Sequence, residues 1–210
     1  MVELDIKATY LLMSYSETLA KGLSMTSKRL PPGQREARGV LILQIAGIPR
    51  VDVKTWRLEV LGEVEKPETF SIDDLNAIPG VVSVADFHCV EGWSILDNKW
   101  EGILLRTIAY IVKPKPNAKY VTFECEDCYA TSLPVSDLLG DDVLLAYKLG
   151  DKPLSTERGG PLRLVVPKKY AYKSAKWIRK IKFTITQEIG FWEARGYSNT
   201  ADPWKEERYA

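Results

Sequence analysis

Beyond residue 55, short runs of side chains that favour β-strands divide the chain. Residues 56–64 alternate apolar and polar side chains, residues 120–123 are all strong β-formers, and the mostly apolar run at 162–166 stops at Pro167. Short helices are predicted at residues 71–77, where Ser71 can cap the first turn, and at 104–112 and 135–139. The pattern predicts a fold built mainly from strands, with a few short helices.

The first 38 residues follow a different pattern. Apolar side chains recur at intervals of three and four from Leu4 to Leu23, which predicts one amphipathic helix ending near Gly22. A polar arm follows, at residues 24–38. With 210 residues, 45% of them apolar, the chain is long enough for one domain with a real core. We therefore expect an N-terminal helix and arm at 1–38 and a single domain at 39–210.

Charge and hydropathy restrict the partners and the compartment. The 29 basic and 28 acidic side chains nearly balance, so a uniformly basic surface for nucleic acid is not expected. No stretch approaches the roughly 20 apolar residues of a membrane span, and no signal peptide is visible. Three cysteines are too few for a secreted disulfide framework. These features predict a soluble, cytoplasmic protein.

The most unusual segment places a cysteine beside the only histidine of the chain. His88 and Cys89 follow the apolar run 81–85, where a strand would deliver them to a turn. A buried cysteine next to a core histidine is the ordinary structural explanation. A cysteine hydrolase is disfavoured, because adjacent strand residues point to opposite faces and His88 is badly placed to take the proton of Cys89.

The other two cysteines form a Cys-x-x-Cys pair, Cys125 and Cys128. A zinc site would need a second such pair or two histidines, and the chain has neither. Two incidental cysteines at a strand end and a redox-active pair are about equally compatible with this spacing. A thiol redox protein that uses Cys125 and Cys128 therefore stays open as an alternative.

A third possibility is a metal that takes one thiolate from the protein and its remaining ligands from a cofactor that supplies its own sulfurs. An anionic cofactor would need cations and close backbone approach. Residues 157–167 offer Gly159, Gly160 and Arg163, and Lys176 follows. The competing explanation for these basic residues is a solvated strand edge.

Ordered motifs resemble the molybdopterin-binding domain of the sulfite oxidase family, from about Pro31 to the C-terminus. They lie at residues 56–67, 88–94, 100–102, 129–134, 144–147, 159–167, 176–177 and 190–209. The similarity is greatest to the short, stand-alone sulfite-oxidase-like oxidoreductases. It implies an α+β fold with a largely β, mixed-sheet core. It also implies two-electron oxygen-atom transfer on a small substrate, with electrons exchanged with a partner.

The resemblance implies a site. Cys89 would be the protein ligand of molybdenum, or of tungsten, next to the sulfurs of one pterin. Tyr129 falls on the position of the family's active-site tyrosine, where its phenol could donate a hydrogen bond to substrate. The family often carries His or Asn at the position of Arg158. The residues expected to bind the cofactor are His88, Cys89, Cys125, Arg158, Arg163, Ser174, Ala175 and Lys176.

Two departures from the family bear on the substrate. Sulfite oxidases hold their oxyanion with two arginines, whose positions here fall near Leu43 and Gln44 and on Trp93 and Ser94. Sulfite is therefore not the expected substrate, unless Arg50 or Arg106 replaces the missing pair. A molybdopterin-binding protein without catalytic activity is a further alternative.

Overall fold

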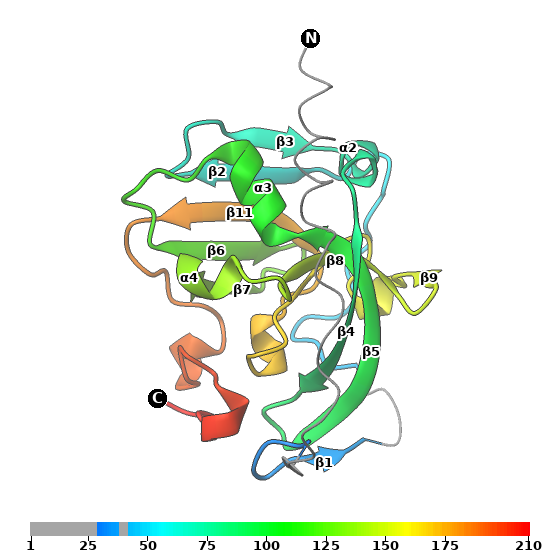
Figure 1. The fold of residues 1–210 in the computed structure, drawn as a ribbon, viewed down its shortest axis with the longest axis vertical. Helices are drawn as coiled ribbons and strands as arrows, with labels where there is room; N and C mark the ends of the chain where they lie inside the picture. Colours follow the sequence, from blue (N-terminus) through cyan, green and yellow to red (C-terminus); the bar gives the residue numbers. More distant parts are fainter. Residues whose placement is uncertain (1–28, 38–41) are drawn as a thin grey trace, which may run out of the picture.

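The computed structural model describes residues 29–37 and 42–210, and the predicted helix at residues 4–23 lies outside them. Figure 1 shows two twisted sheets that share the centre of the domain, with short helices at their margins. No helix in the described part of the chain is long and apolar enough to cross a membrane.

The first sheet has six strands and carries the cysteine turn. Its strands are β1 (Arg35–Glu36), β4 (Val81–His88), β5 (Trp93–Leu104), β8 (Leu144–Leu149), β9 (Lys152–Pro153) and β10 (Arg163–Val165). The path runs β1–β5–β8–β10, with β4 paired to β5 and β9 to β8. Only the β1–β5 pair of this sheet is parallel within the described residues.

The second sheet has five strands in the order β3–β2–β11–β6–β7. Their bounds are Leu58–Gly62 (β2), Glu68–Phe70 (β3), Tyr120–Cys125 (β6), Ala130–Pro134 (β7) and Ile178–Thr184 (β11). The β2–β11 pair is parallel and its neighbours are antiparallel. Both sheets are therefore mixed, and the predicted mixed-sheet core is confirmed.

Strand alternation places the core between the sheets. Leu58 and Val60 of β2 are fully buried, whereas Glu59 between them is not. These two side chains belong to the same apolar cluster as Ile103 of β5 and Leu164 of β10. Each such buried side chain contributes about 1.5–3 kcal/mol to folding. The alternation read from residues 56–64 therefore gives the correct inward face.

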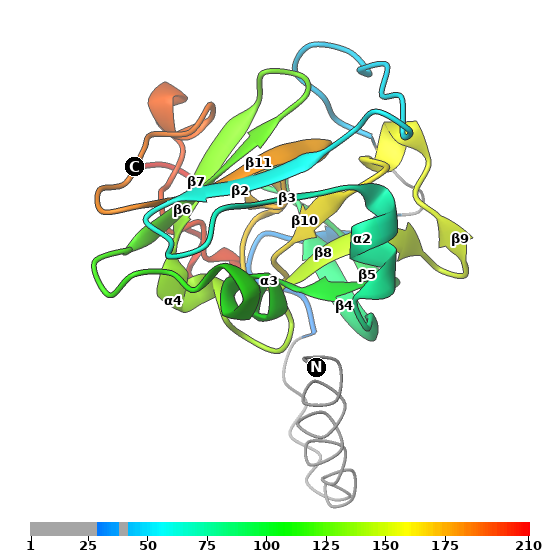
Figure 2. The same ribbon diagram turned by 90° about the horizontal axis from the view of Figure 1, so that it is seen from above.

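The short helices also lie where the sequence predicts them, as α2 (Ile72–Ala77), α3 (Leu105–Val112) and α4 (Val135–Leu138). Ser71 caps α2 in a reciprocal capping box with Asp74. The second sheet continues into a C-terminal segment with two 3-10 helices, η3 (Glu193–Arg195) and η4 (Pro203–Lys205). Figures 1 and 2 show this segment beside β6 and β7.

Candidate active site

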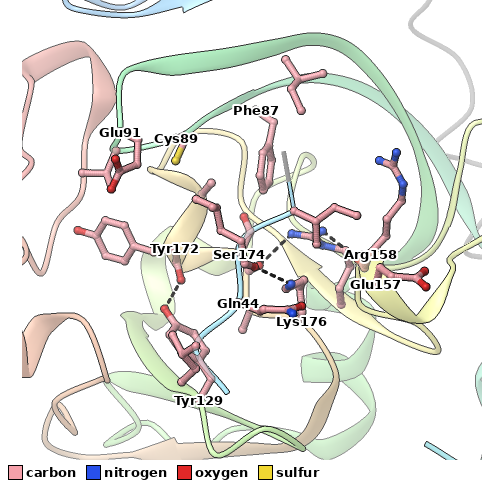
Figure 3. Close-up of a pocket in the computed structure, with 18 of the residues that line it drawn as sticks. Gln44, Phe87, Cys89, Glu91, Tyr129, Glu157, Arg158, Tyr172, Ser174 and Lys176 are labelled. Atoms are coloured by element: carbon pink, nitrogen blue, oxygen red, sulfur yellow. Dashed lines mark hydrogen bonds between the residues drawn. The ribbon is translucent and has the colours of Figure 1, made fainter. Parts of the chain in front are cut away.

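A cavity of about 370 Å³ lies where the two sheets meet the C-terminal segment. Figure 3 shows Cys89, Glu91 and Tyr172 on one side of it and Arg158 and Lys176 on the other. We call these sides the thiol end and the cationic end. The volume is that of a small-molecule or cofactor site.

The thiol end is formed by the turn between β4 and β5. The Cys89 amide donates to the Trp93 carbonyl at 2.8 Å, and the Gly92 amide donates to the Cys89 carbonyl at 3.0 Å. The side-chain amide of Gln34 donates to the same carbonyl at 2.9 Å. The predicted position of Cys89 at the end of a strand is thus observed, and the turn fixes its thiol toward the cavity.

Burial keeps the thiol of Cys89 neutral in the absence of a ligand. Its pKa is raised to about 11, first by burial. A metal ion would take this sulfur as thiolate, so binding would release a proton. Arg208 of the C-terminal segment also reaches the turn, where its guanidinium donates to the Val90 carbonyl.

His88 lies on the other side of the strand. Its Nδ1 is 2.8 Å from the hydroxyl of Ser94, and that hydroxyl donates to the side-chain oxygen of Gln34. The single Ser94 proton is therefore used, so Nδ1 of His88 must be the donor. His88 is not among the residues that line the cavity. This geometry gives His88 a structural contact, and the cofactor contact expected from the resemblance stays a prediction.

The cationic end is formed by the 3-10 helix η1 (Thr156–Arg158), strand β10 and the segment before β11. Arg163 is buried and donates to the carbonyls of Arg158 and Ser174, each at 3.0 Å. Lys176 donates to the Leu43 carbonyl at 2.7 Å. Among the described residues, Arg158, Arg163 and Lys176 form no ion pair with a carboxylate, although Glu157 and Asp127 also line the cavity.

The two innermost cations are destabilised by their surroundings. Burial, and then the charge of Arg158, lowers the pKa of Arg163 to about 10. Burial, and then the charge of Arg163, lowers the pKa of Lys176 to about 8. The charge of Asp127 offsets this only in part at Lys176, so the cluster of like charges favours binding of an anion.

Gly159 allows these cations to converge. Its φ of +102° is a conformation that other residues rarely adopt, and a Cβ there would lie 3.0 Å from Lys176 Cβ. Ser174 and Ala175 are fastened to β10, because Ser174 Oγ accepts from the Val166 amide and the Ala175 carbonyl accepts from the Leu164 amide. The predicted residues Arg158, Arg163, Ser174, Ala175 and Lys176 all line one cavity with Cys89.

Tyr129 also lines the cavity, but its hydroxyl is already engaged. It donates to the Tyr172 carbonyl at 2.5 Å. Burial raises the pKa of Tyr129 well above its usual value. With its one proton committed, the phenol is not free here to donate to a substrate, and it instead positions the 3-10 helix η2 (Ala171–Lys173).

Sequence reasoning missed an aromatic wall at the thiol end. Tyr172, Trp192 and Tyr197 line the cavity, with ring centroids 5.6 Å apart for Tyr172 and Tyr197 and 5.0 Å apart for Trp192 and Tyr197. The aromatic composition of residues 190–210 is typical of a tail wrapped over the body of the domain, with edge packing as the simplest role for its rings. The only signal for their role is that they belong to the family motif at 190–209.

Other candidates lie outside the cavity. Cys125 is buried at the end of β6, Cys128 is exposed, and both thiols are free. Cys125 is not among the lining residues. Arg106 pairs with Asp141, and Arg50 lies in a separate shallow depression beside Asp52. Leu43, Gln44 and Trp93 do line the cavity, so uncharged side chains occupy these positions.

A buried thiol faces three cations that form no ion pair among the described residues, and comparisons with known proteins show which family carries this arrangement. The family model described as "Oxidoreductase molybdopterin binding domain" matches residues 45–192. The uncharacterized oxidoreductase YuiH of Bacillus subtilis is 41% identical over 184 residues, which cover 87% of this chain and 93% of YuiH. The chain belongs to the molybdopterin-binding oxidoreductase family, as the motifs predict, and is a molybdopterin-dependent oxidoreductase.

Two further relatives are longer proteins. The protein-methionine-sulfoxide reductase catalytic subunit MsrP of Campylobacter jejuni is 34% identical over 160 residues, 68% of this chain and 54% of MsrP. A putative protein-methionine-sulfoxide reductase subunit, YedZ1 of Azospira oryzae, is 35% identical over 151 residues, which cover 72% of this chain and 57% of YedZ1. The sulfane dehydrogenase SoxCD structure from Paracoccus pantotrophus has a TM-score of 0.63 and 25% identity, covering 67% of this chain and 41% of that one. This likeness confirms the predicted fold class.

Proposed function

We propose that Cys89 is the protein ligand of a molybdenum or tungsten ion carried by a molybdopterin. The cationic end would hold the phosphate of the pterin through Arg158, Arg163 and Lys176. One observation carries this proposal: a buried thiol and three cations without carboxylate partners, among the described residues, face the same cavity. A phosphate dianion would offset the charge that burial destabilises.

When bound, the cofactor supplies two-electron oxygen-atom transfer. The chain's own residues bind and orient it. Gly159 allows the backbone to approach closely, Arg163 and Lys176 neutralise the phosphate, and Cys89 fixes the metal end. Tyr172, Trp192 and Tyr197 form an apolar boundary that limits water at the thiol end.

The proposed substrate is a small S-oxide or N-oxide, which is reduced, and not sulfite. The positions near Leu43, Gln44 and Trp93 are uncharged, and the guanidinium of Arg106 is paired elsewhere. An oxyanion at the thiol end would therefore meet no lining cation, at a cost of several kcal/mol. The names of the methionine-sulfoxide reductase relatives are consistent with reduction.

The test combines composition with turnover. Purified protein is analysed for molybdenum and tungsten, and for pterin fluorescence after the cofactor is released. Reduced methyl viologen, standing in for the electron-transfer partner, should then drive reduction of a neutral dialkyl sulfoxide. Sulfite oxidation with ferricyanide should be absent or very slow. Metal and pterin without any turnover would instead indicate a non-catalytic molybdopterin-binding protein, and efficient sulfite oxidation would remove the preference for reduction.

The thiol redox alternative predicts a different result. Cys125 is buried and burial raises its pKa well above the usual value, so its thiolate is disfavoured. Thiols are counted under native and denaturing conditions before and after reduction. We expect three free thiols in the metal-free protein. A Cys125–Cys128 disulfide whose reduction abolishes activity would favour the alternative.

A further inference from the structure

The charges that line the cavity are separated along its length. Arg158, Arg163 and Lys176 gather at the cationic end, whereas the charged lining residue of the thiol end, among those described, is Glu91 (Figure 3). Arg208, which contacts the turn at Val90, does not line the cavity and is paired with Glu206 at 3.7 Å. A substrate at the thiol end therefore meets Glu91 as the charged lining residue. Arg208 is close enough for its charge to lower the pKa of Cys89, and that charge is offset in part by Glu206.

The same end carries the aromatic wall. Tyr197 is packed between Tyr172, at an interplanar angle of 73°, and Trp192, at 55°. Burial raises the pKa of Tyr197, and the charges of Tyr209 and Glu91 raise it further, so Glu91 acts electrostatically on this wall. The faces of aromatic rings attract organic cations, and a carboxylate beside them adds to that attraction.

We propose that the thiol end recognises a cationic group on the substrate, such as a quaternary or protonated amine near the S-oxide or N-oxide. This inference rests on the proposed function and names the substrate class of that site. The wall would contact the alkyl groups around the cationic nitrogen, and Glu91 would pair with its charge. An anionic analogue would be repelled by the same carboxylate.

Reduction of such a sulfoxide breaks its S–O bond. The reaction consumes two electrons and two protons and releases a thioether and water. Two equivalents of reduced methyl viologen supply the electrons in the assay, and solvent supplies the protons. The cationic group keeps its charge throughout, so it contributes binding and orientation only.

Three matched probes test the proposal. Each is a methyl ethyl sulfoxide with a trimethylammonium, a tert-butyl or a carboxylate group at the end of the ethyl arm; the first two have nearly the same shape. We expect kcat/KM to be about tenfold higher for the cation than for its neutral isostere, mainly through KM, and lowest for the anion. Calorimetric binding of the corresponding thioethers, which have no oxygen to transfer, should show the same order without turnover.

Two pairs of variants locate the effect. Glu91→Gln should reduce the preference for the cation by about fivefold, whereas Glu65→Gln, a matched change at an exposed carboxylate outside the cavity, should leave the preference as it is. Tyr197→Leu should reduce the preference, and Tyr197→Phe should retain most of it. Metal content and circular dichroism of every variant show that the site is intact.

The outcomes separate this inference from the proposed function. Equal kcat/KM for the cationic and neutral sulfoxides, or a Glu91→Gln variant that loses kcat equally for all probes, would overturn it, while turnover of the neutral sulfoxide would still support reductase activity. No turnover of any S-oxide or N-oxide by metal-loaded protein would overturn the proposed function. The thioether binding series then decides cation recognition alone.

Discussion

The two ends of the cavity are built in different ways. The cations of the cationic end come from one stretch of chain, residues 158–176, which is joined mainly by side-chain-to-backbone hydrogen bonds within that stretch, with one outside contact from Lys176 to Leu43. The thiol end joins segments far apart in sequence: Gln34, the turn after β4, and the C-terminal segment through Arg208. The comparison shows that local sequence supplies the charge of the site, while the arrangement of the chain termini shapes its reactive end.

Burial also affects the ionisable groups of the two ends in opposite directions. Arg163 and Lys176 are cations whose pKa values are lowered by burial, so an anion that pairs with them is favoured. Cys89 is a thiol whose pKa is raised, so the free protein is neutral there. The affinity for phosphate should thus depend on the charge of the cationic end. Metal binding should depend on the sulfur atom of Cys89.

The largest effect is expected at the thiol end. Cys89→Ser should lower sulfoxide reduction by at least about 100-fold, because a hydroxyl is a poor replacement for a soft thiolate. The pterin should be retained in part through its phosphate. Metal content should be low. Elemental analysis measures the metal, pterin fluorescence the retained pterin, and the viologen assay the activity. Cys128→Ser is the matched control, since this thiol is exposed and outside the cavity. Full activity in Cys89→Ser would contradict the ligand assignment.

The next effect contrasts two lysines that are three residues apart. Lys176→Ala should lower cofactor occupancy about tenfold or more, through loss of a charged hydrogen bond, and should not lower the melting temperature of the cofactor-free protein. Lys173 is fully buried and pairs with Glu193, so Lys173→Ala strands a buried carboxylate and should cost about 3–5 kcal/mol of stability. Differential scanning calorimetry and pterin quantification separate occupancy from stability.

Arg163→Ala is a less selective test of the phosphate site. Cofactor occupancy should also fall in this variant, but loss of the guanidinium leaves the carbonyls of Arg158 and Ser174 without their donors, so stability should fall as well. If occupancy is unchanged in both Arg163→Ala and Lys176→Ala, the phosphate lies elsewhere.

A smaller effect is the pH dependence of anion binding at the cationic end. Lys176, with a pKa of about 8, loses its charge as pH rises from about 7 to 9, so the rise in melting temperature caused by sulfate should shrink over this range. Lys176→Arg should remove the pH dependence, because arginine keeps its charge. Sulfate is a suitable probe because its own charge is constant there.

Without sulfate, the contribution of Lys176 to stability changes with pH in the opposite direction. Between about pH 8 and 10.5 the unfolded chain binds more protons at Lys176 than the folded chain does. This residue's contribution to the free energy of unfolding therefore increases with pH in that window. The free energy of unfolding is measured for the wild type and for Lys176→Arg across this window. If the difference between them does not increase with pH, Lys176 is in a more solvated position.

Local signals were enough for most of the fold and for the cationic end. Alternation gave β2, a capping serine gave α2, and a Pro167 stop gave the end of β10, because each depends on neighbouring residues. Gly159, Arg163 and Lys176 are also close in sequence, so their convergence follows from one motif. The order and pairing of the eleven strands found in the described residues depend on contacts between distant segments, which the sequence alone did not specify.

The thiol end was predicted less completely for the same reason. Alternation on a strand correctly indicates that His88 and Cys89 face opposite ways, yet the resemblance also suggested a cofactor contact for His88. Trp192 and Tyr197 reach the cavity only because the C-terminal segment folds back beside β7, whereas Tyr172 reaches it from η2. Their aromatic composition is equally compatible with edge packing, so no local rule separates the two roles.

The smallest effect is expected at Tyr129, whose hydroxyl donates to the Tyr172 carbonyl at the thiol end. Tyr129→Phe removes the hydrogen bond to the Tyr172 carbonyl, which is worth about 1 kcal/mol, so kcat for the neutral sulfoxide should fall about fivefold while metal content stays constant. Tyr110→Phe, at a ring that is 82% exposed, is the matched control. Loss of metal in Tyr129→Phe would show that the hydrogen bond holds the site together. A loss of more than about 100-fold with full metal would show that the phenol gives up its bond to Tyr172 and donates directly to the substrate, because positioning alone does not account for an effect of that size.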